Sequence, residues 1–173
     1  YNDAMLHRKL LALCFPLGSV LLILSVIFQM DIAASPVGGT FLLTILWVVF
    51  LFFTALLVYT LFFSFPTASA YAAPGKKRPV YVKGFYALCR HPGVLWASGS
   101  LLCLWLVGGL PLYAAITYIL LNVALVAFED HYVFPIVLSG YEEYKRSIPF
   151  LIPTPNSIKT AFSKKRTGSV TGR

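Results

Sequence analysis

The residues best suited to chemistry in this sequence are Arg90 and His91, which stand immediately before a long apolar run. Cationic or titratable side chains at the border of a membrane segment cost free energy unless a polar group meets them there. A guanidinium can bind a carboxylate through two parallel hydrogen bonds, and an imidazole can donate to a carboxylate or to the backbone. The pair predicts either a site for a polar ligand or a cationic membrane anchor beside a helix-capping histidine.

Pro92 indicates where the next helix begins, because a proline has a fixed φ and no N–H and therefore suits a first helical turn. Segments 93–110 and 111–128 follow, both apolar and of equal length, about 27 Å each at a rise of 1.5 Å per residue. A short Gly-Gly-Leu-Pro turn joins them. An antiparallel hairpin with equal arms returns the chain to its starting depth. We therefore expect the residues after the hairpin to emerge beside Arg90.

Glu129 and Asp130 are the residues that emerge there. Two carboxylates at a helix C-terminus would oppose the helix macrodipole, so something other than helix stability must hold them. We expect Glu129 to be the anionic neighbour of Arg90 and to share the site with a cationic ligand group. The alternative is that both carboxylates are solvated and mark the end of a membrane span.

The composition is that of a multi-span membrane protein. Of the 173 residues, 58% are hydrophobic and only 12% are charged, and the mean hydropathy is +0.79. A soluble domain carries about a quarter charged residues. A bilayer needs about 20 apolar residues per transmembrane helix. Four segments near that length predict four spans, at residues 10–30, 40–65, 93–110 and 111–128.

The net charge of +8 follows the positive-inside rule and does not require a nucleic-acid partner. Lys and Arg residues gather before the first predicted span, between the second and third, and after the fourth. The connections around residues 31–39 and 108–109 contain none. Both termini are therefore expected in the cytosol. The cysteines form no CxxC pair and the histidines no HExxH motif, so neither a disulfide framework nor a metal site is predicted.

The remaining segments predict interfacial or cytosolic structure. Residues 67–92 are expected to form a loop, whose basic cluster Lys76-Lys77-Arg78 favours contact with anionic headgroups. Residues 132–140 contain an apolar run too short to span, interrupted by Pro135, and are expected to be interfacial or re-entrant. The next short helix should carry Tyr141, Tyr144 and Ile148 on one face.

The predicted domain organisation is simple. Residues 1–155 are expected to form a single membrane-embedded domain. Residues 156–173, rich in Ser, Thr and basic residues, predict a disordered tail.

Three ordered motifs over about residues 80–153 resemble the isoprenylcysteine carboxyl methyltransferase and phospholipid methyltransferase superfamily. They are Gly84-x-Tyr86-x-x-x-Arg90-His91-Pro92, the acidic pair Glu129-Asp130 after the hairpin, and Gly140-Tyr141-x-x-Tyr144-x-x-x-Ile148-Pro149. The resemblance implies an all-α integral membrane domain of four transmembrane helices, with a C-terminal helical hairpin and cytosolic segments that bind S-adenosylmethionine. It also implies methyl transfer to a lipid or isoprenylcysteine-like carboxyl or amine. Like that family, the chain lacks the GxGxxG motif of a Rossmann domain.

The resemblance and the chemistry of the cofactor together assign expected roles. Arg90 would bind the carboxylate at the methionine end of the cofactor, and Glu129 would accept from its amine or ribose; these two are the expected catalytic residues. His91 would donate to the carboxylate or to the backbone. The helices would offer a lateral apolar route for the acceptor. The other expected cofactor-binding residues are Tyr86, Pro92, Asp130, Tyr141 and Tyr144, of which the tyrosines would cover the adenine.

Two positions depart from the longer motif of that family. Val94 stands where the family has tyrosine, and Trp96 where it has glycine. These departures favour a second hypothesis, a non-catalytic membrane scaffold or ligand-binding module that keeps the fold. Arg90, His91 and Glu129 favour the enzyme.

Overall fold

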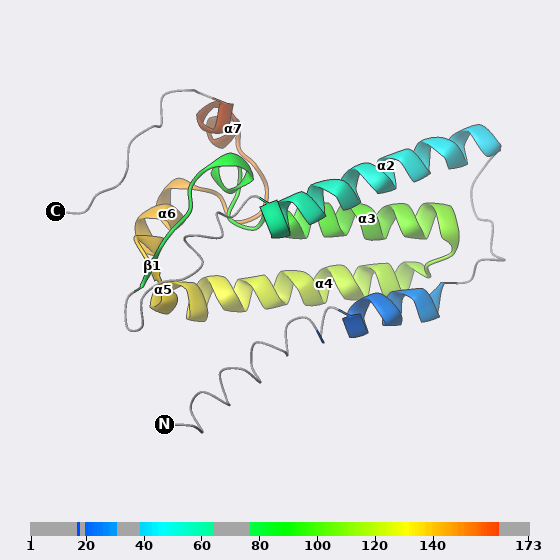
Figure 1. Ribbon diagram of the computed structural model, residues 1–173, viewed down its shortest axis with the longest axis horizontal. Helices are drawn as coiled ribbons and strands as arrows, with labels where there is room; N and C mark the ends of the chain where they lie inside the picture. The colour runs from blue at the N-terminus through cyan, green and yellow to red at the C-terminus, as the bar shows by residue number, and fades with distance from the viewer. Residues whose placement is uncertain (1–16, 18–19, 31–38, 64–76, 163–173) are drawn as a thin grey trace, which may run out of the picture.

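The computed structural model describes residues 17, 20–30, 39–63 and 77–162, and this part of the chain is mostly helical (Figure 1). An unlabelled first helix, Val20–Gln29, precedes the labelled elements. The helices are α2 (Thr40–Val58), α3 (Pro92–Gly108), α4 (Leu112–Phe128), α5 (Phe134–Val137), α6 (Tyr141–Ser147) and α7 (Pro155–Phe162). The shorter elements are the π-helical turns Tyr59–Phe63 and Glu129–Val133, the 3₁₀ helix Gly84–Ala87, and the strands β1 (Arg78–Pro79) and β2 (Leu138–Ser139).

Two helices are long and apolar enough to cross a membrane. The first is Thr40–Phe63, formed by α2 and its π-helical extension, and the second is the continuous run Leu112–Val137. Helices Val20–Gln29 and Pro92–Val107 are apolar but shorter. The predicted first span also includes residues 10–16, 18 and 19, which lie outside the described residues, as do residues 64 and 65 of the second.

The boundaries of α3 follow from local chemistry. Pro92 occupies the start of the helix, which confirms the expectation drawn from its fixed φ and missing N–H. Gly109 ends the helix in the left-handed conformation, with φ 83°, a conformation that glycine adopts without steric cost. Leu110 and Pro111 complete the turn, and α4 then runs back beside α3 (Figure 1).

Close contact between α2 and α3 depends on a glycine. A Cβ atom on Gly99 would lie 2.8 Å from the ring of Phe53, so the aromatic ring occupies the space that a side chain would take. Small residues at such positions allow neighbouring membrane helices to approach closely. Two polar contacts support the same interface, since Trp96 Nε1 donates to Thr60 Oγ1 at 3.1 Å and Thr54 Oγ1 lies 3.3 Å from Ser100 Oγ.

The first helix packs against α4 near the turn that follows α3. The buried core there consists of Val26, Leu110, Ala114 and Ala115. Polar contacts accompany it, because the Tyr118 hydroxyl is hydrogen-bonded to both Ser25 and Gln29. Hydrogen bonds between helices in an apolar layer stabilise a particular pairing, and these join Val20–Gln29 to α4.

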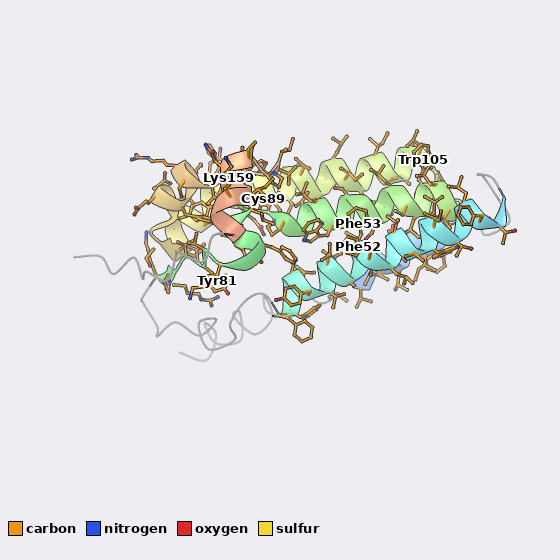
Figure 2. The ribbon with its side chains drawn as sticks, turned by 90° about the horizontal axis from the view of Figure 1, so that it is seen from above. Phe52, Phe53, Tyr81, Cys89, Trp105 and Lys159 are labelled. Carbon is orange, nitrogen blue, oxygen red and sulfur yellow. The ribbon has the colours of Figure 1, made fainter. Side chains whose placement is uncertain are left out.

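The polar elements gather at the other end of the bundle, where α2 ends and α3 begins (Figure 1). Figure 2 places Trp105 at the far end of the helices from Cys89, Tyr81 and Lys159. β1 pairs in parallel with β2, with Arg78 opposite Leu138 and Pro79 opposite Ser139. β1 lies within the segment predicted to be a loop, and β2 lies within residues 132–140, predicted to be interfacial or re-entrant.

The structure corrects two predicted boundaries. The helix that begins at Leu112 does not end at Phe128, because Glu129–Val133 continues it as a π-helical turn and α5 extends it to Val137. Pro135 therefore lies near the start of α5 and does not break the run. Local π-helical adjustment is one way in which membrane helices accommodate a proline.

The second correction concerns the predicted disordered tail, because residues 155–162 form α7. A reciprocal cap stabilises its first turn: the Ser157 N–H donates to Thr154 Oγ1, and the Thr154 N–H donates to Ser157 Oγ. Pro155 adds a pre-set φ at the helix start. Residues 163–173 of the predicted tail lie outside the described residues.

Candidate functional site

The candidate site forms where three segments meet at the polar end of the bundle. The segment before α3 is joined to the segment after α6 by two backbone hydrogen bonds: Arg90 N–H donates to the Pro149 carbonyl at 2.9 Å, and His91 N–H donates to the Phe150 carbonyl at 3.3 Å. The third segment is the π-helical turn Glu129–Val133. The motif that contains Arg90 is thus hydrogen-bonded through its backbone to the motif that ends at Pro149.

The carboxylate of Asp130 is the centre of the site. Arg90 Nη1 lies 2.9 Å from Oδ1 and 3.0 Å from Oδ2, and His91 Nε2 lies 3.2 Å from Oδ1. The Tyr141 hydroxyl donates to Oδ1, and Lys145 Nζ lies 3.4 Å from Oδ2. Only 6% of the Asp130 side chain is exposed. A buried carboxylate is tolerated when charged and hydrogen-bonding partners replace water, and Asp130 has four such partners.

Asp130, and not Glu129, is therefore the anionic neighbour of Arg90. Adjacent helical residues project about 100° apart, so which of the two faces Arg90 depends on how the helix is rotated about its axis. Glu129 is half-buried, and within the described part of the chain its side chain makes no hydrogen bond or ion pair. Its carboxylate is available to a partner outside the described residues.

Arg90 has unused hydrogen-bonding capacity. Only 9% of its side chain is exposed, and its Nε is buried without a hydrogen-bond partner among the described residues. The guanidinium also lies over the Phe150 ring, 5.4 Å from the ring centroid. A buried donor without a partner is costly, so Nε marks a place where an additional acceptor would be stabilised.

His91 is held between two aromatic rings. The Phe134 ring is stacked on the imidazole at 5.9 Å between centroids, and the Phe150 ring meets it edge-on at 5.0 Å. Burial lowers the pKa of His91 below its usual value, and the neighbouring Arg90 lowers it further. Asp130 acts in the opposite direction, through its hydrogen bond and its charge. Burial is the largest of these effects, so the pKa stays below its usual value, and because a carboxylate only accepts, Nε2–H is the donor to Asp130.

The three tyrosines expected to cover an adenine occupy two different positions. Tyr141 and Tyr144 are buried with Ile148, which confirms the predicted apolar face of α6. Their hydroxyls are engaged, Tyr141 with Asp130 and Tyr144 with the Tyr86 carbonyl at 2.7 Å. Burial raises the pKa of both phenols, so both remain neutral donors. These two support the site, whereas Tyr86 is only partly buried and meets Tyr81 edge-on.

The other expected site positions belong to the beginning of α3. Pro92 is fully buried at the helix start, where it fixes the direction of the backbone after His91. Val94 is buried as well. The Trp96 ring packs between Phe53 of α2 and Phe85 of the 3₁₀ helix, so it joins α2 to the segment that carries Tyr86. Trp96 therefore has a packing role at the edge of the site.

Sequence reasoning missed three contributors to the site. Lys145 had no signal beyond its place on α6, four residues after Tyr141, where an α-helix returns to the same face. Phe134 and Phe150 carry no polar atom and no motif, so only the folded arrangement reveals that they enclose His91. Within the described residues, no cluster of three His, Cys, Asp or Glu side chains could hold a metal ion.

In comparisons with known proteins, no family model matched this chain, and no curated protein or solved structure matched it either.

Proposed function

We propose that this chain is an integral-membrane, S-adenosylmethionine-dependent methyltransferase that acts on a lipid or isoprenylcysteine-like carboxyl or amine. In this proposal four helices span the bilayer and both termini lie in the cytosol. The two helices of spanning length, the two shorter apolar helices and the distribution of Lys and Arg support that placement. The three motifs that resemble the methyltransferase superfamily support the chemistry.

The observation that carries the proposal is the buried Nε of Arg90, which has no hydrogen-bond partner among the described residues. Two cations, Arg90 and Lys145, lie against the Asp130 carboxylate, and the adjacent Glu129 carries a second carboxylate. The free donor of Arg90 fits the carboxylate of an amino acid group such as the methionine end of the cofactor. Glu129, half-buried without a partner in the described chain, fits the corresponding amine or a ribose hydroxyl.

S-adenosylmethionine supplies a methyl group on a sulfonium, and in-line displacement from it requires orientation more than acid–base help. The residues of the chain would provide that orientation. Asp130 fixes the direction of the Arg90 guanidinium and the tautomer of His91. Tyr141 and the aromatic rings of Phe134 and Phe150 exclude water from the buried side of the site.

The exposed surface of α2 fits an acceptor with an acyl or prenyl chain. A shallow, open stretch of apolar surface runs along α2 and reaches its polar end. Its lining residues are Leu51, Thr54, Ala55, Val58, Tyr59 and Phe63. Apolar surfaces with few polar groups are typical of lipid-binding sites.

The experiment that tests the proposal is transfer of a labelled methyl group from S-adenosylmethionine, by the purified full-length chain in nanodiscs, to lipid extracts and prenylcysteine analogues. Label in an organic-soluble product is the expected result, and Arg90→Gln should abolish it while Glu142→Ala should not. Glu142 is an exposed residue of α6. Absence of transfer to every acceptor class, with the cofactor still bound, would contradict the enzymatic assignment.

A non-catalytic scaffold is the second candidate, and one observation favours it. The Asp130 carboxylate contacts Arg90, His91, Tyr141 and Lys145 of the same chain. The same contacts would serve a purely structural role, in which Asp130 holds three segments of the chain together. The packing of Trp96 between Phe53 and Phe85 agrees with such a role. Turnover distinguishes the candidates, whereas cofactor binding alone does not.

A further inference from the structure

The last helix, α7, lies across the bundle and not along it. In Figure 1 the membrane-length helices run along the page and α7 is seen nearly end-on, just beyond the polar ends of α2 and α3. A helix in that position would lie in the plane of a membrane crossed by the bundle. Amphipathic helices in that orientation are typical of the membrane interface.

The surface of α7 is divided between a buried and an exposed side. Ser157 is buried, and α7 packs against the 3₁₀ helix Gly84–Ala87. Ile158 is 42% exposed, and Ile152, just before the helix, is 75% exposed. Lys159 is exposed beside Ile158. Exposed isoleucines beside a lysine fit a membrane interface. The isoleucine side chains can enter the apolar layer, and the lysine side chain is long enough for its charge to reach the headgroups.

The charge of the surrounding chain has a single sign. From Lys145 to Arg173 the sequence contains seven Lys and Arg residues and no Asp or Glu. In the described part, Lys145, Arg146 and Lys159 carry this charge at the polar end of the bundle. A basic segment beside exposed apolar side chains complements an anionic phospholipid surface.

We propose that α7, with Ile152, is an interfacial anchor that binds anionic phospholipid headgroups at the polar end of the bundle. This inference rests on the membrane placement stated under the proposed function, and it does not require methyl transfer. Because α7 contacts Gly84–Ala87, the segment that leads to Arg90, binding of α7 to the membrane fixes the depth of the candidate site at the headgroups.

The experiment places a fluorophore on α7 and measures its contact with lipid. Ile158→Cys is labelled with bimane in a Cys14→Ser chain, where the remaining Cys89 and Cys103 are buried. The chain is held in nanodiscs, with and without phosphatidylserine, of phosphatidylcholine brominated near the headgroup for positions 158 and 156 and along the acyl chains for position 120. Asn156→Cys, about 200° away around the helix, is the matched control. Leu120→Cys, on the exposed face of α4, reports membrane placement.

The expected result is that bromine quenches the labels at positions 158 and 120 and leaves that at 156 bright. Phosphatidylserine should increase quenching at position 158. Lys159→Gln should lower the equilibrium constant for binding of α7 to the membrane about fivefold, the value for one basic residue near an anionic surface. A bright label at 158 with quenching at 120 would overturn the anchor and leave the membrane placement intact. Bright labels at both positions would overturn both.

Two further outcomes would overturn the inference. Equal quenching at position 158 with and without phosphatidylserine would remove anionic headgroups as the partner. Self-quenching between labelled chains, insensitive to bromine, would identify a second copy of the chain as the partner of α7.

Discussion

Arg90 and Asp130, 40 residues apart in the chain, form a buried ion pair in which Nη1 lies within hydrogen-bonding distance of both carboxylate oxygens. Removing one member of such a pair leaves the other charge without compensation. We expect Asp130→Ala to lower the free energy of unfolding by about 3–5 kcal/mol. The neighbouring Glu129→Ala is the matched control and should change stability little, because within the described residues Glu129 has no such partner. Thermal unfolding of both variants in detergent measures the difference, and equal effects would contradict the pairing.

Glu129 should matter for the cofactor and not for the fold. If it accepts from the amine or ribose of S-adenosylmethionine, Glu129→Ala removes one partner of a charged hydrogen bond, at about 2–5 kcal/mol. The affinity should then fall at least about thirtyfold. Glu142→Ala changes the same residue type on the exposed side of α6 and should leave affinity unchanged. Calorimetry in detergent decides this, and unchanged affinity in folded Glu129→Ala would remove Glu129 from the site.

The pKa of His91 predicts a dependence of stability on pH. Burial lowers the pKa in the folded state below its unfolded value of about 6.5. The unfolded chain therefore binds more protons in the interval between the two values, and stability rises with pH there. The contribution is fully present above about pH 6.5 and is lost as the pH falls through the folded pKa.

His91→Gln tests this expectation, because a glutamine keeps a donor for Asp130 and does not titrate. The melting temperature of the wild-type chain should fall more between about pH 7.5 and pH 5 than that of the variant. Parallel pH profiles for the two proteins would show that His91 does not titrate in this way.

Gly99 should resist substitution because the Phe53 ring fills its side-chain position. The added Cβ in Gly99→Ala would lie 2.8 Å from three ring atoms, so α2 and α3 must separate or the ring must move. We expect a cost of about 1–3 kcal/mol, the usual range for overpacking. In Gly93→Ala the nearest atom, Leu57 Cδ1, lies 3.9 Å away, and the change should be neutral or stabilising through helix propensity. Unfolding of the two variants in detergent compares them.

Cys89 should be inert in the folded protein. It is fully buried, and burial raises the pKa of its thiol to about 11, so almost no thiolate forms at neutral pH. In a Cys14→Ser chain, a maleimide reagent should leave Cys89 unmodified until the protein unfolds, whereas Lys83→Cys at an exposed position should react at once. Mass spectrometry of the labelled peptides locates the modification, and rapid labelling of Cys89 would contradict its burial.

Features with a strong local signal could be predicted from the sequence. The start of α3 follows from Pro92, and the buried face of α6 follows from the spacing of Tyr141, Tyr144 and Ile148. Both features depend on residues that are close together in the sequence, so the sequence alone is sufficient to predict them.

Features set by tertiary packing could not be predicted. Whether Glu129 or Asp130 faces Arg90 depends on how α4 and its extension are rotated about the helix axis, which the sequence does not reveal. Strands β1 and β2 have two residues each, too few for an alternating pattern. The helix α7 lies in a polar segment, and its stability depends on a cap at Thr154 and on contact with Gly84–Ala87.

The two backbone hydrogen bonds from Arg90 and His91 to Pro149 and Phe150 also set an order of events during biosynthesis. A chain is made from its N-terminus, and its earlier parts fold first. The helices that precede Asp130 are therefore synthesised before α6 and Phe150. Until residue 150 has been added, Arg90 and His91 lack the carbonyls that receive their N–H groups. The site is thus completed last, and a chain truncated before α6 would leave the Arg90 and His91 N–H groups without these two partners.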